Sequence, residues 1–167
     1  VLTRMPKDFV GAYRVPDFVS SIGLCAINGC NGLTSLVIPK SVTVIEKDNF
    51  ELCEQLASLV VEQGNPMFDS RENCNAIIVT ATDTLVHGCN GSTIPDSIEV
   101  IADYAFSQRR NLSSISIPDS VVYIGEFAFL GCYSLESEIK LQGIRQVSRS
   151  CFDGCSSLKK VTIGSCI

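Results

Sequence analysis

The stretch SIPDSVVYIGEFAFLGCYSLESEIKL, residues 116–141, decides the fold because its apolar residues follow neither of the two common periods. A helix repeats apolar residues every three or four positions, and a half-buried strand repeats them at every second position. The apolar residues here are Ile117, Val121, Ile124, Phe127, Phe129 and Leu135. This spacing therefore indicates neither a regular helix nor a regular strand.

The same spacing recurs along the chain. Segments that begin at Val15, Ile38, Ile94 and Ile117 align column by column, and the step is 23 residues, since 45 minus 22 and 124 minus 101 both give 23. One column holds Ile22, Ile45, Ile101 and Ile124, a second Ile27, Phe50, Phe106 and Phe129, and a third Leu33, Leu56, Leu112 and Leu135. A period of this size is typical of a solenoid, in which each coil buries its apolar face only by stacking on its neighbours.

Each coil is predicted to hold one short strand, at the motif L-x-x-L/I-x-I/V. Alternation along a strand points Leu36 and Ile38 into the core and Val37 outward. Pro39 follows directly, and its missing N–H and fixed φ end the strand. The return side of the coil is expected to be irregular or 3₁₀, because it holds no segment long enough for a regular helix.

Residues 62–93 interrupt the period and contain a predicted β-hairpin. The segment AIIVTATDTLVHG has two apolar, β-prone runs around a short polar turn. If residues 81–82 form the turn, Cys74 faces Cys89 within the reach of a disulfide bond. A bulged turn that also uses Asp83 shifts the register by one residue and puts the two sulfurs on opposite faces. The sequence leaves both registers open.

The nine cysteines are an odd number, so at least one thiol is unpaired within the chain. A metal site needs a C-x-x-C motif or a Cys/His cluster, and the sequence has neither, so no metal and no cofactor is expected. Cys25 and Cys151 are expected to pack, and Cys166 to be exposed near the end of the chain. Four cysteines share one repeat column and are predicted to be buried free thiols: Cys30, Cys53, Cys132 and Cys155.

Composition and charge exclude several classes of protein. With 167 residues, of which 46% are apolar and 19% charged, the chain can form one folded domain. The net charge of -5 comes without any basic cluster longer than Arg109-Arg110, which argues against nucleic-acid binding. No stretch approaches the roughly 20 apolar residues of a membrane span. The chain starts with VLTRMPKDF, which does not begin with an initiator Met and is not a signal peptide. We therefore expect a piece of a longer protein, whose targeting signal or membrane anchor lies elsewhere.

The sequence offers no catalytic residues. His87 is the one histidine, and it is expected at the surface or in a turn, without an Asp or Asn placed to orient it as a base. The chain has no G-x-S-x-G, P-loop or G-x-G-x-x-G motif. We therefore predict that it is not an enzyme.

The repeats resemble the BspA-like (treponemal-type) leucine-rich repeats, whose units follow IPxSVxxIGxxAFxxCxxLxxIxIP. The resemblance covers nearly the whole chain, and GNPMFDSRENCNAIIVTATDTLVHGCNGSTIP is similar to a longer unit of gut-bacterial members. One departure is Arg109, which replaces the column Cys. The resemblance implies a leucine-rich-repeat solenoid, a right-handed horseshoe of the β/α type with one parallel strand per coil.

We expect a single leucine-rich repeat domain over residues 1–167. Its predicted parts are a partial unit 1–14, repeats 15–37 and 38–60, the long hairpin unit 61–93, repeats 94–116, 117–140 and 141–163, and a truncated end 164–167.

One strand position per coil should form an extended concave face suited to large partners. Its residues are mostly small and polar, without the aromatic and Arg anchors of tight interfaces, which predicts weak, broad or multivalent contact. The candidates are Thr34, Ser35, Val37, Ala57, Ser58, Val60, Ser113, Ser114, Ser116, Glu136, Ser137, Lys140, Lys159, Lys160 and Thr162.

The resemblance implies a non-enzymatic, extracellular or cell-surface bacterial protein that adheres to host matrix proteins such as fibronectin or fibrinogen, or to other bacteria. A structural spacer in a larger surface protein is the alternative. Glycan binding is disfavoured because the face has almost no exposed aromatic residues. Neither nucleic acid nor membrane insertion is expected.

Overall fold

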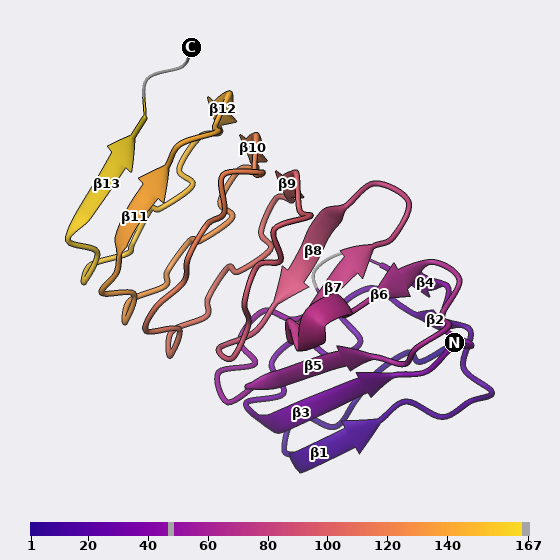
Figure 1. The fold of residues 1–167 in the computed structure, drawn as a ribbon. Helices are drawn as coiled ribbons and strands as arrows, with labels where there is room; N and C mark the ends of the chain where they lie inside the picture. Colours follow the sequence, from indigo (N-terminus) through magenta and orange to yellow (C-terminus); the bar gives the residue numbers. More distant parts are fainter. Residues whose placement is uncertain (47–48, 165–167) are drawn as a thin grey trace.

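The computed structural model describes residues 1–46 and 49–164, which wind as a β-solenoid of about seven turns with almost no helix (Figure 1). The longer strands are β1 (Val10–Arg14), β3 (Gly32–Ile38), β5 (Ser58–Val61), β11 (Glu138–Leu141) and β13 (Lys160–Ile163). Two-residue strands lie on another side of the coils: β2 (Ser21–Ile22), β4 (Val44–Ile45), β9 (Val100–Ile101), β10 (Tyr123–Ile124) and β12 (Gln146–Val147). The long unit holds β6 (Phe68–Asp69), the 3₁₀ turn η1 (Arg71–Asn73), β7 (Ala76–Val79) and β8 (Thr84–Gly88).

The coils stack in register at the predicted step. Leu36 in β3 pairs with Leu59 in β5, and Ile101 in β9 pairs with Ile124 in β10. The rings of Phe106 and Phe129 stack with centroids 4.9 Å apart and planes at 4°. Equivalent side chains therefore contact one another from coil to coil, as a solenoid requires.

The alternation along β3 is confirmed. Leu36 and Ile38 are fully buried, and Val37 is half-buried on the outer side. Pro39 follows β3 directly, so the strand ends where the proline removes the next ladder donor.

The return side is more ordered than predicted. It carries the two-residue parallel strands, and the turn after β2, β9, β10 and β12 is made by a residue in the left-handed conformation. This residue occupies one column, where Cys25, Tyr104, Phe127 and Ser150 all have φ between 52° and 58°. Such values are uncommon for residues other than glycine, so the stacking must stabilise the turn.

A strand was predicted in the coil 94–116, and this prediction is wrong, because the structure assigns none to residues 112–117. The backbone N–H of Ile115 donates to the Ser137 side chain instead of to a ladder partner. β-branched and aromatic residues favour strands, whereas this coil has three serines in the segment NLSSIS.

The long unit divides the sheets and the core. Strands β12, β10, β9, β8, β7 and β6 form one six-stranded sheet, whereas β4 pairs with β2 alone among the described strands. One apolar core lies in the first coils and includes Ile77, and a second lies in the later coils and includes Ile78. The β7–β8 hairpin, in the middle of Figure 1, thus sends neighbouring side chains into two different cores.

The hairpin register leaves Cys74 and Cys89 as free thiols, so of the two alternatives that the sequence left open the disulfide does not form. Val79 pairs with Thr84, but a bulge then shifts the register, so that Ile77 faces His87. A shift of one residue reverses the face to which every later side chain points. Cys74 accordingly packs in the second core and Cys89 in the first.

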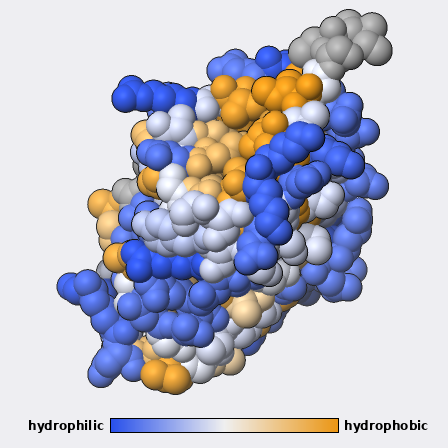
Figure 2. Space-filling model, turned by 90° about the vertical axis from the view of Figure 1, so that its left-hand side faces the viewer, coloured by the Kyte–Doolittle hydropathy of each residue, from blue (hydrophilic) through white to orange (hydrophobic). Residues whose placement is uncertain are grey.

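The last described coil exposes apolar side chains. Figure 2 shows the molecule from the side of this coil, with an apolar patch on its surface. The exposed apolar residues of β13 are Val161 and Ile163, which are 39% and 60% exposed. Their counterparts in β11, Ile139 and Leu141, are buried by β13. Burial in this fold therefore depends on a neighbouring coil.

Candidate binding sites

The fifteen candidate residues, which we call the exposed strand face, all lie at the surface. Each is exposed or half-buried. Ser35 pairs with Ser58 and Val37 with Val60 in the sheet β1–β3–β5, and Lys140 pairs with Thr162 in the sheet β11–β13. The face therefore runs over two separate sheets, with the strandless residues 112–117 between them.

The chemistry of the exposed strand face changes along the stack. Its first two coils carry no charge, and its middle coil contributes three serines. Its charged residues all lie in the last two coils: Glu136, Lys140, Lys159 and Lys160. Glu138, beside them, pairs directly across the sheet with Lys160, where opposite charges attract.

Part of this face is hollowed. Ser114, Ser116, Ser137 and Lys140 line, with Glu138, a hollow of about 430 Å³ beside β11. The hollow lies where the missing strand would have paired with β11. The structure thus brings four of the predicted residues to one place.

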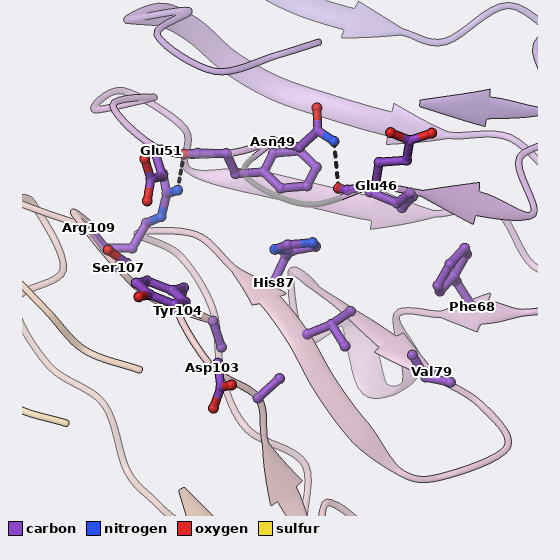
Figure 3. A pocket seen from close by; sticks show the side chains of 15 residues that line it. Glu46, Asn49, Glu51, Phe68, Val79, His87, Asp103, Tyr104, Ser107 and Arg109 are labelled. Carbon is purple, nitrogen blue, oxygen red and sulfur yellow. Dashed lines mark hydrogen bonds between the residues drawn. The ribbon is translucent and has the colours of Figure 1, made fainter. Parts of the chain in front are cut away.

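A second site, which the sequence did not reveal, lies at the break between β4 and the hairpin. It is a cavity of about 440 Å³ (Figure 3). Its walls are largely apolar and come from Ile45, Phe50, Phe68, Val79, Val86 and Ala105. Polar lining side chains include Asn49, His87, Ser107 and Arg109, with Glu46, Glu51 and Asp103.

The cavity exists because the long unit has no full return loop. After β8 the chain crosses at once to Asn90, whose N–H donates to the carbonyl of Leu56 at 3.0 Å. The coil 94–116 therefore faces the coil 38–60 across a gap. Arg110 pairs with Glu54 at 3.1 Å across it, and the Asn111 amide donates to the Glu54 carbonyl, also at 3.1 Å.

Arg109 crosses the same gap and explains the departure from the Cys column. In regular coils the column thiol donates to the carbonyl of the preceding coil, as Cys53 does to Ile27 at 3.2 Å and Cys132 to Phe106 at 3.1 Å. Arg109 donates from Nη2 to the equivalent carbonyl of Phe50, and from Nη1 to the carbonyl of Cys53 at 3.1 Å. The longer side chain makes the bond that a thiol could not reach.

His87 is half-buried on β8 and lines the cavity, instead of lying at the open surface or in a turn as predicted. Its ring lies 4.6 Å from that of Phe50, at 60°. Burial and the positive charge of Arg109 lower the pKa of His87 to about 3. The ring is therefore neutral at physiological pH, and the bulge at Val86 has turned it inward.

The cysteine column is confirmed as free thiols, and its burial is confirmed for three of the four. Cys30, Cys53 and Cys132 are fully buried and Cys155 is half-buried. Cys151 packs in the core as expected, but Cys25 is exposed because it occupies the left-handed turn position. The prediction for Cys166 lies outside the described residues.

Two further properties concern the described residues as a whole. In the ranges 1–46 and 49–164, no group of three or more His, Cys, Asp or Glu residues could hold a metal ion. None of the helical structure in this part of the chain is long and apolar enough to cross a membrane.

The repeat columns, the register and the long unit agree with a known family. The model of the BspA type leucine-rich repeat region matches residues 11–84 and 87–167, in six copies. The chain belongs to this family. No curated protein matches this BspA type chain at a significant level.

Solved structures show the same fold. A leucine-rich repeat protein from Eubacterium ventriosum is 23% identical, with a TM-score of 0.77 over 92% of this chain and 42% of its own. The pneumococcal vaccine antigen PcpA is 19% identical, with a TM-score of 0.63 over 92% of this chain and 50% of its own. A leucine rich cell surface protein from Faecalibacterium prausnitzii is 17% identical, with a TM-score of 0.50 over 96% and 61%. The BspA type chain thus spans less than two thirds of each of these proteins.

Proposed function

We propose that this BspA type repeat region is a non-enzymatic protein-binding module of a bacterial cell-surface or secreted protein, and that it binds through the exposed strand face. The observation that carries the proposal is the row of exposed side chains that is repeated in register within the pair β3–β5 and within the pair β11–β13. Leucine-rich repeat proteins generally bind proteins through such repeated surfaces. The cell-surface protein of Faecalibacterium prausnitzii, which shares the fold, supports the proposed location.

The charged end of the face suggests how a partner is held. Lys140, Lys159 and Lys160 outnumber Glu136 and Glu138 in these two coils, although the chain as a whole has a net charge of -5. An acidic segment of a protein partner would be attracted to these lysines. Because the side chains are exposed and lack aromatic anchors, each contact is weak and screened by salt. Useful affinity then requires several contacts at once.

Immobilised fibronectin and fibrinogen are the partners for a first test, measured by surface plasmon resonance at low and physiological ionic strength. We expect binding to weaken with salt, and to weaken about tenfold when Glu136, Lys140, Lys159 and Lys160 are all changed to Ala. The matched control changes the exposed Arg145 and Arg149 on the return side to Ala and should bind like the wild type. An unchanged affinity of the fourfold variant would remove the exposed strand face from consideration.

A further inference from the structure

Two cysteines of the repeat column lie at equivalent positions in the coils that carry β11 and β13, at the C-terminal end of the solenoid (Figure 1). Cys132 and Cys155 are 23 residues apart, since 155 minus 132 is 23, and both are free thiols. The rings three residues before them, Phe129 and Phe152, stack with centroids 5.2 Å apart. A disulfide bond needs Cα atoms about 4.4–6.8 Å apart, and coils stacked at this spacing meet the requirement.

The backbones of these two coils are in contact directly beside the cysteines. A Cβ on Gly154 would lie 3.3 Å from the Cα of Gly131. The N–H of Gly131 donates to the carbonyl of Asp153 at 2.8 Å. The Cys132 thiol lies within hydrogen-bonding reach of the Cys155 sulfur. The two sulfur atoms are therefore adjacent before any bond forms between them.

A bond between the sulfurs would leave neither of their present acceptors without a donor. Cys132 donates to the carbonyl of Phe106 at 3.1 Å, and that carbonyl also accepts the N–H of Arg109 at 3.1 Å. Cys155 donates to the carbonyl of Phe129 at 3.1 Å, and that carbonyl also accepts the N–H of Cys132 at 3.3 Å. Each carbonyl keeps its backbone hydrogen bond when the thiol proton is lost, so oxidation orphans neither of them.

The two thiols differ in access and in acidity. Cys155 is half-buried, whereas Cys132 is fully buried. A hydrogen bond from Cys132 to the Cys155 thiolate lowers the pKa of Cys155, although burial and the charge of Asp153 oppose this shift. The same hydrogen bond, together with burial, raises the pKa of Cys132. Because the thiolate is the nucleophile in thiol–disulfide exchange, Cys155 is the thiol that reacts first.

Other buried cysteines lack this combination. Cys30 and Cys53 are also one period apart in the same column, but both are fully buried, and burial raises the pKa of each. A reagent in solution therefore finds no exposed thiol in that pair. Cys151 is 3% exposed, and burial raises its pKa to about 12, so it competes poorly with its neighbours.

We propose that Cys155 and Cys132 form a thiol–disulfide exchange site, at which a small disulfide compound oxidises the pair and joins the coils 117–140 and 141–163 covalently. The Cys155 thiolate attacks one sulfur of the compound, forms a mixed disulfide and releases one thiolate. The Cys132 thiolate then attacks the Cys155 sulfur, the Cys132–Cys155 bond forms and the second thiolate leaves. The pair loses two electrons and two protons, and the compound is reduced to two thiols. The site does not depend on the exposed strand face or on a protein partner.

The first test treats the folded wild-type chain with excess bis(2-hydroxyethyl) disulfide, blocks the remaining thiols with N-ethylmaleimide and maps the peptides by mass spectrometry. We expect a cross-linked peptide pair that contains Cys132 and Cys155. The exposed Cys25 should carry only the small thiol, because its repeat column holds no second cysteine, and it reports that the reagent is active. A Cys155 that stays reduced while Cys25 reacts, a bond between other cysteines, or a mixed disulfide that persists on Cys155 would each overturn the proposal.

Thermal unfolding gives an independent measurement. The oxidised chain should unfold at a temperature higher by about 5 °C or more, because the new bond closes a loop in the unfolded chain, and dithiothreitol should reverse the shift. The Cys155→Ala variant, treated in the same way, should show no such shift. Equal shifts in the wild type and in this variant would contradict a bond at Cys155.

Variants also separate the two roles. Cys132→Ala should leave Cys155 as a persistent mixed disulfide, and Cys155→Ala should leave Cys132 unmodified, because a buried thiol is not reached from solution. Cys53→Ala changes the same column in another coil and is the matched control, which should still form the Cys132–Cys155 bond. Circular dichroism checks that each variant is folded. Modification of Cys132 in the Cys155→Ala variant at the wild-type rate would overturn the assigned order of reaction.

Discussion

Arg109 and the column cysteines donate the same kind of hydrogen bond to a carbonyl of a neighbouring coil, but the side chain of Arg109 is longer. The Cys53 and Cys132 thiols satisfy carbonyls in the adjacent coil, and Arg109 satisfies the Phe50 carbonyl across the gap left by the long unit. A buried carbonyl that loses its donor costs about 1–3 kcal/mol. The hydrogen bond to this carbonyl is kept although the donor side chain differs. The two halves of the solenoid therefore remain connected where the coil pattern is interrupted.

The first residue-scale prediction concerns this bridge. Arg109→Ala should lower the free energy of unfolding by about 3 kcal/mol, because it orphans two buried carbonyls and leaves a void. Arg110→Ala removes a partly exposed ion pair with Glu54 and the contact of the guanidinium with the Tyr133 ring, and it should cost about 1 kcal/mol. Urea denaturation followed by circular dichroism measures both. Equal losses would contradict the role given to Arg109.

The second residue-scale prediction concerns His87 and pH. Its folded pKa of about 3 lies below the ordinary value of 6.5, so in acid the unfolded chain binds a proton that the folded chain does not. The stability contributed by the neutral ring is therefore present above pH 6.5 and is lost as the pH falls toward 3. His87→Phe keeps the ring contact with Phe50 but cannot bind a proton. When the pH falls from 7 to 4.5, its free energy of unfolding should therefore decrease by up to about 2 kcal/mol less than that of the wild type. Urea midpoints at the two pH values provide the measurement, and identical losses would show that His87 is accessible to protons.

At the scale of elements, the long unit is the part that departs from the repeat. Arg71 in its 3₁₀ turn pairs with Asp69 of β6 at 2.7 Å and with Asp83 of the hairpin turn at 2.5 Å. These pairs fasten the turn of the β7–β8 hairpin to the edge strand. At the other end the unit crosses so close to the coil 38–60 that a Cβ on Gly91 would lie 2.3 Å from the Ala57 carbonyl oxygen.

Gly91→Ala should therefore destabilise the chain by about 2 kcal/mol, since the clash is with backbone that must shift. Gly23→Ala is the matched control, because its Cβ would lie 3.3 Å from the Leu2 carbonyl oxygen and needs a much smaller movement. Thermal unfolding of both variants tests this comparison. A Gly91 variant as stable as the Gly23 variant would mean that the crossing can relax away from Ala57.

At the scale of the whole molecule, the solenoid is two stacked cores joined by one hairpin. Coils in a solenoid contact only their neighbours, so stability is close to a sum of coil and interface terms. The hairpin contributes Ile77 to the first core and Ile78 to the second. A substitution that destabilises one core should therefore affect the stability of the other core only through β7 and β8.

This arrangement predicts that two adjacent substitutions act on different halves. Ile77→Ala and Ile78→Ala each remove a fully buried side chain and should each cost about 2–5 kcal/mol. Hydrogen exchange with mass spectrometry should show lost protection mainly in β3 and β5 for the first variant, and in β9 and β10 for the second. Loss of protection over the whole chain in both variants would instead mean a single cooperative core.

The sequence by itself determined the solenoid, the 23-residue step, the inward columns and the buried thiols, because each depends on residues that recur at fixed spacing. Only the tertiary structure decided the hairpin register, where a single bulge reverses the faces of Cys74 and Cys89. It also decided the cavity, since Arg109 meets a carbonyl 59 residues away across a gap that exists only when the coils are stacked. A repeat pattern specifies what lies one period away, whereas an interruption places residues beside partners that no local pattern encodes.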